Sequence, residues 1–405
     1  MASTYDRYSE AVNGAPNPRV LTLELSNTCN LACEMCWGHY SSKIRSVRDR
    51  LPAVPSPYDE AFLDQIVPLL PTVQEVRFVG GEPLLVPLYR KMLKAIAHHN
   101  PLIEVRITTN GTVVDHELEE LMWGMNMSIH FSIDSFTPET YEGIRKGGTF
   151  STVMSNFRRF VSLRDEGKIH MIGVSICPMR SNIHEIPSML SLLNEMGIPA
   201  YFNNTTYPTF LSLRTLHPTL LNPIVRELEE LQPIHDGDLG NQLQLEGLVT
   251  QLKGWSYLNG KLVSYGAQDL RDTLENRSDN VNKEVQRISL ILIEIHIHTV
   301  FQVDDSEGFK AVRSKLDQLA RNADEQISVE LIDAIKLVAE VIGNITGRNL
   351  HGQAVSFNRF LKDTPNAYRV LLSFIVRNDI IFMLHTLDDE TIENMASFAV
   401  YDEKR

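Results

Sequence analysis

Three of the four cysteines in this chain lie within eight residues, in the segment that runs from Cys29 through Cys33 to Cys36. The spacing C-x3-C-x2-C is typical of metal or cluster ligands rather than of a disulfide framework. Three thiolates cannot complete the four-cysteine ligation of a four-iron cubane, so one iron is left for an outside ligand. The alternative is a zinc site with His39 as fourth ligand, although structural zinc usually takes two close pairs of ligands.

The cysteines follow the first of six short runs of mostly apolar and β-branched residues, which alternate with amphipathic stretches up to about residue 204. This alternation predicts an α/β fold with repeated β/α units around a parallel sheet. The expected strands are Val20–Leu25, Glu75–Val79, Glu104–Thr108, Met127–Ile133, His170–Ile176 and Ala200–Asn203. The expected helices between them are Tyr58–Leu69, Pro87–His98, Asp115–Met122, Phe150–Asp165 and Ile183–Met196, and Thr137 is expected to cap another that starts at Pro138.

The last third of the chain has a different pattern, with apolar residues at three- and four-residue spacing. It predicts a mainly α-helical domain, with helices at Leu243–Leu252, Val281–Ile293, Gly308–Asn322, Val329–Ile342 and Ala367–Ile375. A loop and a helix between Pro208 and Leu231, and a turn-rich linker at residues 235–241, precede it. We expect an N-terminal extension (1–18), a catalytic core (19–235) and a helical accessory domain that shapes substrate binding (236–405).

Polar segments follow three more of the predicted strands. Gly80, Gly81 and Glu82 follow the second strand, Asn110 lies in a Thr-Thr-Asn-Gly-Thr segment after the third, and the fourth ends in Ser132-Ile-Asp134. Paired glycines permit close approach of the backbone to a ligand, and Ser132 and Asp134 share one face of their strand. Taken singly each segment is also a common turn or cap. Barrel enzymes build their active sites from the loops at this end of the strands.

Together these segments resemble the signature of the radical S-adenosylmethionine (SAM) superfamily, and the resemblance covers about residues 19–204. It implies a partial (β/α)6 TIM-like barrel in which Cys29, Cys33 and Cys36 hold a [4Fe–4S] cluster whose open iron binds SAM. Reductive cleavage of SAM then gives a 5′-deoxyadenosyl radical that abstracts hydrogen from a substrate. The residues implied to contact SAM are Met35, near the adenine, together with Gly80, Gly81, Glu82, Asn110, Ser132, Asp134 and Arg145.

Within the superfamily the chain looks nearest to the peptide- and cofactor-maturing branch, which implies a ribosomally made peptide substrate in natural-product maturation. Members of that branch often carry auxiliary clusters, whereas no cysteine follows Cys177 here. This departure puts two-electron oxidation in doubt and leaves redox-neutral epimerisation or elimination on a sugar or other small intermediate as an alternative. A non-catalytic binding protein that retains the barrel is the alternative from another class.

Two further features admit both a functional and an ordinary interpretation. Cys177, at the end of the fifth predicted strand, is a candidate hydrogen-atom donor to a substrate radical, although a lone cysteine is more often a small core hydrophobe. The run of Lys43, Arg45, Arg48 and Arg50 is a candidate docking site for an acidic flavodoxin or ferredoxin reductant. Such runs are more often solvated surface.

Composition limits the remaining possibilities. The 405 residues include 43% hydrophobic and 22% charged residues, as in ordinary soluble proteins, and no run of 18 apolar residues predicts a membrane span. A net charge of −13 argues against general affinity for nucleic acid. The first 17 residues lack the apolar segment of a secretory signal, so we expect a cytoplasmic protein without a membrane partner.

Overall fold

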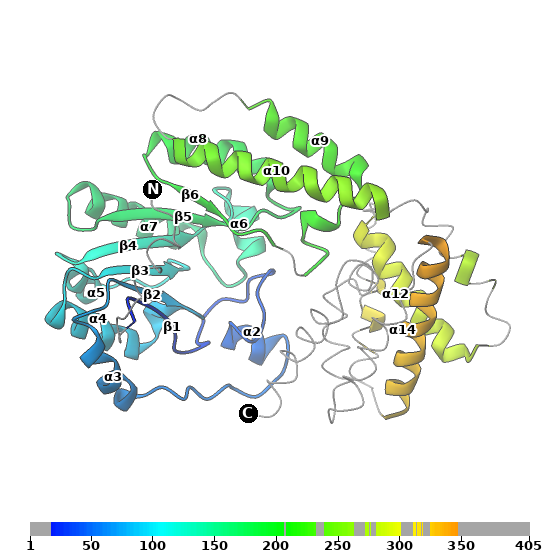
Figure 1. Cartoon of the computed structure of the whole chain (residues 1–405), viewed down its shortest axis with the longest axis horizontal. Coiled ribbons are helices and arrows are strands. Elements are labelled where there is room, and N and C mark those ends of the chain that lie inside the picture. Colours follow the sequence, from blue (N-terminus) through cyan, green and yellow to red (C-terminus); the bar gives the residue numbers. More distant parts are fainter. Residues whose placement is uncertain are drawn as a thin grey trace. The chain divides into compact units, whose positions relative to one another are not determined.

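The computed structural model describes residues 18–205, 208–231, 239–262, 272–274, 276, 281–300, 311–312, 314–316, 318 and 325–346. Its centre is a six-stranded parallel sheet in the order β1-β2-β3-β4-β5-β6, so that every strand pairs with the next one along the chain (Figure 1). The strands are β1 (Val20–Glu24), β2 (Glu75–Val79), β3 (Glu104–Thr109), β4 (Asn126–Ser132), β5 (Met171–Ile176) and β6 (Ala200–Phe202). All six predicted strands are therefore confirmed, each to within one residue at either end.

Helices connect the strands and cover one face of the sheet. They are α2 (Ser42–Val47), α3 (Glu60–Ile66) with η1 (Val67–Leu69), η2 (Pro83–Leu85), α4 (Pro87–His99), α5 (His116–Met122), α6 (Pro138–Ile144), α7 (Phe150–Asp165), η3 (Ile183–Glu185) and α8 (Ile186–Glu195). Alternate strand residues pack against them, as period-two geometry requires. Phe131 of β4 contacts the rings of Phe157 and Phe160 in α7 at centroid distances of 5.4 and 5.5 Å. This parallel α/β arrangement agrees with the predicted partial barrel.

Side-chain caps fix where several of these helices begin. Asp59 accepts a hydrogen bond from the backbone N–H of Phe62 at the start of α3, and Asp115 accepts one from Leu118 in α5. The expected cap at Thr137 is wrong in detail: Thr137 occupies the N-cap position of α6, but its side chain makes no capping hydrogen bond. Ser135 accepts the Thr137 N–H instead, at 2.8 Å.

The chain divides into two compact units, residues 1–203 with 233–244, and residues 204–232 with 245–405. The described elements after β6 are helical: η4 (Leu213–Thr215), α9 (Pro218–Glu229), α10 (Leu239–Leu262), α12 (Lys283–Val300) and α14 (Glu325–Thr346). Helices α12 and α14 run side by side, and Ser289 donates a hydrogen bond to the Ala334 carbonyl between them (Figure 1). The helices predicted at Leu243–Leu252, Val281–Ile293 and Val329–Ile342 are confirmed. The one predicted at Gly308–Asn322 falls largely outside the described residues, and the one at Ala367–Ile375 entirely outside them.

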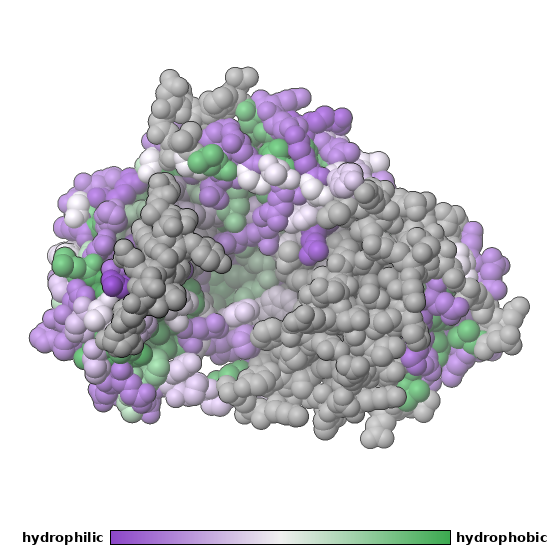
Figure 2. All heavy atoms as spheres, in the orientation of Figure 1, coloured by the Kyte–Doolittle hydropathy of each residue, from purple (hydrophilic) through white to green (hydrophobic). Residues whose placement is uncertain are grey.

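Hydrophilic residues cover most of the visible surface of the first unit, with hydrophobic residues scattered among them (Figure 2). Among the described helices, none has the length and apolar character that crossing a membrane would require.

Candidate active site

The cysteine loop follows β1 and is anchored from two sides. On one side, Ser42 at the start of α2 accepts the Cys29 N–H and donates to the Cys29 carbonyl, at 3.1 and 3.2 Å. Ser41, the N-cap of α2, donates to the Leu31 carbonyl at 2.7 Å. On the other side, the N–H groups of Ala32 and Glu34 donate to the carbonyls of residues 146 and 144, at 2.8 and 2.9 Å. The loop is therefore held between α2 and the end of α6.

All four cysteines are free thiols, and no disulfide competes for the three in the loop. Burial raises the pKa of Cys33 to about 12 and that of Cys36 to about 11, and it raises the pKa of Cys29 as well. Negative charge on the neighbouring cysteines also raises the pKa of Cys33 and of Cys36. For Cys29 the neighbouring negative charge is that of Glu82. The loop thus gathers three thiols that need a positive partner to ionise.

The donor set fits a [4Fe–4S] cluster better than a single zinc ion. Among the described residues no three His, Cys, Asp or Glu side chains converge closely enough to hold one ion. Tetrahedral zinc requires all its thiolates about 2.3 Å from the same metal. In a cubane each thiolate binds a different iron, so the sulfurs stand farther apart. Three free thiols in one loop are the donor set of the group that these cysteines were predicted to hold.

The loop after β2 is pressed against the cysteine loop, and glycine makes this possible. A Cβ atom on Gly81 would lie 2.3 Å from the Thr28 carbonyl oxygen, and one on Gly80, whose φ is +88°, would lie 2.6 Å from Glu24. The next residue closes the contact, because the Glu82 N–H donates to the same Thr28 carbonyl at 2.7 Å. The paired glycines thus serve first to bring two backbone segments together.

The Glu82 carboxylate links this loop to the one after β3. It is buried and accepts hydrogen bonds from the Thr109 hydroxyl at 2.8 Å, the Asn110 N–H at 2.6 Å and the Leu84 N–H at 3.0 Å. Burial raises the pKa of Glu82, and these donors oppose the shift. Asn110 continues the chain of contacts, since its side-chain amide lies 3.1 Å from Asn30 Oδ1 and 3.9 Å from Cys29 Sγ.

Asp134 and Arg145 meet each other at the end of β4. Asp134 Oδ1 accepts the Cys177 N–H at 2.7 Å, and Oδ2 lies 2.8 Å from Arg145 Nε. Arg145 also places Nη1 4.0 Å from Cys33 Sγ. Both side chains predicted to contact SAM are therefore engaged with the protein itself, and their contact with SAM remains a prediction.

The other predicted residues lie in the same region. Met35 is half-buried in the cysteine loop, Ser132 is half-buried at the end of β4, and Cys177 follows β5. The basic run needs a correction: Arg45 is buried, and its Nε donates to the Pro52 carbonyl. Arg48 also donates to the Cys36 carbonyl at 3.0 Å. Arg48 thus supports the cysteine loop and Arg45 the segment after α2, whereas Lys43 and Arg50 are the exposed members of the run to which neither contact belongs.

The sequence patterns did not single out Tyr89 or Thr109, both of which position the site. Tyr89 reaches from α4 to the ends of β1 and β2: its hydroxyl accepts the Leu25 N–H at 2.8 Å and lies 2.7 Å from the Val79 carbonyl oxygen. A buried tyrosine at the start of a helix gives no signal of this role in the sequence. Thr109, the last residue of β3, was detectable only as part of the Thr-Thr-Asn-Gly-Thr segment.

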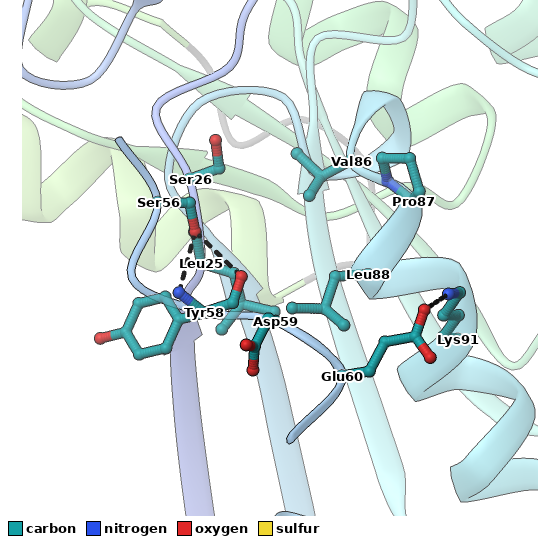
Figure 3. A pocket seen from close by; sticks show the side chains of 10 residues that line it. All are labelled: Leu25, Ser26, Ser56, Tyr58, Asp59, Glu60, Val86, Pro87, Leu88 and Lys91. Atoms are coloured by element: carbon teal, nitrogen blue, oxygen red, sulfur yellow. Dashed lines mark hydrogen bonds and ion pairs between the residues drawn. The ribbon is translucent and has the colours of Figure 1, made fainter. Parts of the chain in front are cut away.

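A pocket of about 360 Å³ lies beside β1, outside the cysteine triad (Figure 3). Leu25, Val86, Pro87 and Leu88 provide its apolar wall, and the ion pair of Lys91 with Glu60 lies at one side (Figure 3). Ser56 donates to the Leu25 carbonyl there, at 2.8 Å. The pocket contains none of the cysteines and none of the residues predicted to contact SAM, so we place the chemistry at the cysteine loop.

Comparison with known proteins agrees with this geometry. Residues 23–193 match the sequence model of the radical SAM superfamily. Proteins named GTP 3′,8-cyclase are similar: that of Desulforamulus reducens is 22% identical over 49% of this chain and 56% of its own length, and that of Chlorobaculum tepidum is 24% identical over 57% of each. The chain thus spans little more than half the length of these relatives.

Two solved structures are also similar in part. Streptococcus suis SuiB bound to its precursor peptide SuiA is 15% identical, with 56% of this chain and 48% of that chain covered and a TM-score of 0.39. The protein anSMEcpe with bound AdoMet is 20% identical, with 53% and 59% covered and a TM-score of 0.41. The family match covers the cysteine loop and the sheet as far as β5, so residues 23–193 carry a radical SAM superfamily domain.

Proposed function

We propose that this chain is a radical SAM enzyme in which Cys29, Cys33 and Cys36 hold a [4Fe–4S] cluster beside bound SAM. The observation that carries the proposal is that one loop contains all three thiols and that its backbone is anchored between α2 and the end of α6. When bound, these two groups supply reductive cleavage of SAM to a 5′-deoxyadenosyl radical, which abstracts hydrogen from the substrate.

The residues of the chain hold and orient these groups. Gly80 and Gly81 let the loop after β2 approach the cysteine loop, and Glu82 ties it to Asn110, so three loops form one rigid unit. Met35, Ser132, Asp134 and Arg145 are the other side chains that we assign to SAM. Arg145 adds a permanent positive charge beside Cys33, which favours the thiolate that iron requires.

Cys177 is the proposed hydrogen-atom donor. Burial raises the pKa of its thiol far above the ordinary range, and the nearby Asp134 carboxylate adds to the shift. The sulfur therefore keeps its proton at neutral pH, and S–H is the form that can give a hydrogen atom to a carbon radical. Its position after β5, at the same end of the sheet as the cysteine loop, supports this role.

The proposed substrate is a ribosomally made peptide, on the basis of the motif resemblance to peptide-maturing enzymes. A redox-neutral reaction on a small polar molecule is the second candidate. The sequence relatives favour a small-molecule substrate, because the name GTP 3′,8-cyclase denotes action on GTP. We propose a flavodoxin or ferredoxin as the reductant, with Lys43 and Arg50 as exposed basic contacts.

The experiment that tests the proposed function is anaerobic iron–sulfur reconstitution followed by dithionite and SAM. We expect about four irons per chain and formation of 5′-deoxyadenosine, both lost in Cys33→Ala and both retained in Tyr58→Phe, whose half-exposed side chain lies outside the cysteine loop. Stoichiometric zinc without iron would contradict the cluster assignment. A well-loaded cluster that yields no 5′-deoxyadenosine would favour the non-catalytic binding protein.

A second experiment separates the two substrate classes. Precursor-like peptides, nucleotides and nucleotide sugars are incubated with the loaded enzyme, and the rate of 5′-deoxyadenosine release is compared with the rate without substrate. Acceleration by a peptide alone would support peptide maturation, and acceleration by a nucleotide or sugar alone would support the small-molecule candidate.

A further inference from the structure

One face of the parallel sheet in residues 18–203 is polar, although parallel sheets are usually apolar on both faces. On the face that packs against the helices, the central strands present Val76, Phe78, Val105 and Ile107, all fully buried. On the opposite face, which we call the inner face, strand register places Thr22, Arg77, Arg106 and Ser128 in one row. Two residues farther along each strand, the register places Glu24, Val79, Thr108, His130 and Gly173 in a second row.

Several inner-face residues are open to solvent even in the middle of the sheet. Thr108 is exposed on β3, which has two strands or more on each side, and Thr22 and Glu24 are exposed on β1. The lumen of a TIM barrel is normally filled by layers of bulky apolar side chains. The polar residues here leave that space for something other than a packed core.

Two arginines dominate the first row. Arg77 and Arg106 are register partners on β2 and β3, and the carboxylates of the buried Glu75 and the half-buried Glu104 hold them from the N-terminal end of the strands. Glu75 Oε1 lies 2.7 Å from Arg77 Nε and 3.0 Å from Arg106 Nε, and Glu104 Oε1 lies 2.7 Å from Arg106 Nη2. The two guanidinium groups are thus held side by side against the repulsion of their like charges.

The exposure of these groups is asymmetric. The Glu75 side chain is 5% exposed, whereas the side chains of Arg77 and Arg106 are 36% and 37% exposed. Ion pairs that are exposed to solvent contribute little to stability, so pairs with a purely structural role in the barrel should have both partners buried. Arg77 donates to both oxygens of Glu75, at 2.7 and 3.1 Å, and Arg106 Nε donates to Glu104 Oε1 at 2.8 Å, so the carboxylates fix the orientation of both guanidinium groups. This is the arrangement of preoriented arginines that recognise carboxylate or phosphate.

The distance to the cysteine loop suits a substrate. Arg106 precedes Asn110 by four residues, which at the strand rise corresponds to about 13 Å along β3. Thr108 and His130, register partners in the second row, lie between the row that contains Arg106 and the end of the strand from which the chain reaches Asn110. The His130 ring lies 4.9 Å from that of Tyr201, and burial and the Arg106 charge lower its pKa, so the imidazole is neutral at neutral pH. A polar molecule about 13 Å long, with one end at Arg106, would contact the neutral Thr108 and His130 side chains along its middle.

We propose that Arg77 and Arg106 form an oxyanion subsite that binds a carboxylate or phosphate group of the substrate, and that this contact orients the rest of the molecule toward the cysteine loop. The role of this subsite in binding substrate rests on the proposed function. Its location rests only on the residues of the inner face. The carboxylate could belong to an acidic peptide side chain and the phosphate to a nucleotide or sugar phosphate.

Binding of simple probes to the full-length protein tests the subsite without turnover. Calorimetric titration at constant ionic strength uses inorganic pyrophosphate as the phosphate probe and a glutamate-containing hexapeptide as the carboxylate probe. We expect at least one probe to bind, and to bind at least tenfold more weakly to Arg106→Lys, which keeps the charge but loses the planar guanidinium that the carboxylates orient. Arg158→Gln, on the exposed side of α7, should bind as the wild type does.

A second variant guards against misfolding. Arg77→Gln alone would leave the buried Glu75 with only Arg106 as a counter-ion, so Glu75→Gln/Arg77→Gln removes both charges of the closer pair together. We expect this double variant to unfold cooperatively and still to bind the probe at least tenfold more weakly. In parallel, phenylglyoxal labelling mapped by mass spectrometry should modify Arg77 and Arg106, and the probe should protect them.

The outcomes separate the two proposals. Pyrophosphate binding alone would identify a phosphate substrate, and hexapeptide binding alone a carboxylate on a peptide. Equal affinity in wild type, Arg106→Lys and the double variant, absence of protection, or failure of both probes to bind the wild type would each overturn the oxyanion subsite. Formation of 5′-deoxyadenosine by the loaded enzyme would be unaffected by that result, so the proposed function would stand.

Discussion

Arg145 lies against Asp134 inside the protein, with Nε 2.8 Å from Oδ2 and side-chain exposures of only 8% and 0%. The two atoms do not have the geometry of a hydrogen bond, so charge holds the pair. Arg145 Nη1 also lies 4.0 Å from Cys33 Sγ. The buried Arg145 cation thus lies beside a carboxylate that follows β4 and a thiol of the cysteine loop, and it links these two segments.

Removal of the Asp134 charge should destabilise the protein strongly. Asp134→Asn leaves Arg145 buried without its counter-ion, and the loss of one partner of a buried pair costs about 3–5 kcal/mol. The free energy of unfolding from urea titration measures it. Glu166→Gln, which alters an exposed ion pair with Lys168, is the control and should change nothing measurable. Equal midpoints for the two variants would refute the structural role of the buried pair.

Substitution at Gly81 should prevent assembly of the site. In Gly81→Ala the new Cβ would lie 2.3 Å from the Thr28 carbonyl oxygen. This oxygen belongs to the backbone, so it could move away only if the loop itself shifted. We expect the loops after β1 and β2 to separate, with loss of iron incorporation and of SAM binding by equilibrium dialysis. Gly143→Ala in α6 meets nothing within 4 Å and adds helix propensity, so it should load iron normally. Normal loading of Gly81→Ala would contradict the close contact.

The Tyr89 hydroxyl should contribute to stability. Tyr89→Phe leaves the buried Leu25 N–H without its acceptor, which costs about 1–3 kcal/mol. Chemical unfolding should show this loss, and Tyr58→Phe, with a half-exposed ring, should not. Because Leu25 lies four residues before Cys29, we also expect Tyr89→Phe to load iron more slowly. An unchanged free energy of unfolding would mean that water replaces the hydroxyl.

Alkylation of the iron-free protein should follow the pKa order of the thiols. Burial raises the pKa of Cys36 to about 11 and of Cys33 to about 12, so both stay protonated at pH 7. The thiolate is the reactive form, so iodoacetamide labelling should rise about tenfold per pH unit between pH 7 and 9, with Cys36 ahead of Cys33. Mass spectrometry measures both rates. Faster labelling of Cys33 would contradict the predicted order.

The same shifts predict alkaline instability. Since the folded-state pKa values lie above the ordinary value of 9.0, the folded form binds these protons more tightly than the unfolded form. The stability that they provide is complete below about pH 9 and is lost as the pH rises to between about 11 and 12. Cys33→Ala should reduce the loss, measured as the unfolding midpoint against pH.

Cys177→Ser should abolish transfer of solvent hydrogen to the product. The protonated Cys177 thiol exchanges with solvent, so product formed in D2O should carry deuterium in the wild type and not in the variant. 5′-Deoxyadenosine should still form, because hydrogen abstraction precedes this step. Unchanged deuterium uptake in Cys177→Ser would remove Cys177 from the reaction.

The sequence by itself determined the parallel sheet, and it pointed to the three cysteines that we propose as cluster ligands. Runs such as Val76 to Val79 and Val105 to Ile107 have the local pattern of strands, and the spacing of Cys29, Cys33 and Cys36 is a property of one short loop. The strand pattern and the cysteine spacing both involve residues close in the chain, for which the periodicity of apolar residues indicates the local backbone structure directly.

Contacts between distant segments were decided only by the tertiary structure. Glu82 was predicted to face SAM, and the structure shows its carboxylate bound by Thr109 and Asn110, 27 and 28 residues away. Arg45, expected on the surface, is buried, and Arg145 pairs with Asp134. The alternation of charged residues in β2 and β3 was visible in the sequence, yet its meaning depended on register, which placed Arg77 beside Arg106. The sequence does not show which residue a charged side chain will pair with, because that partner depends on which backbone segments the fold brings together.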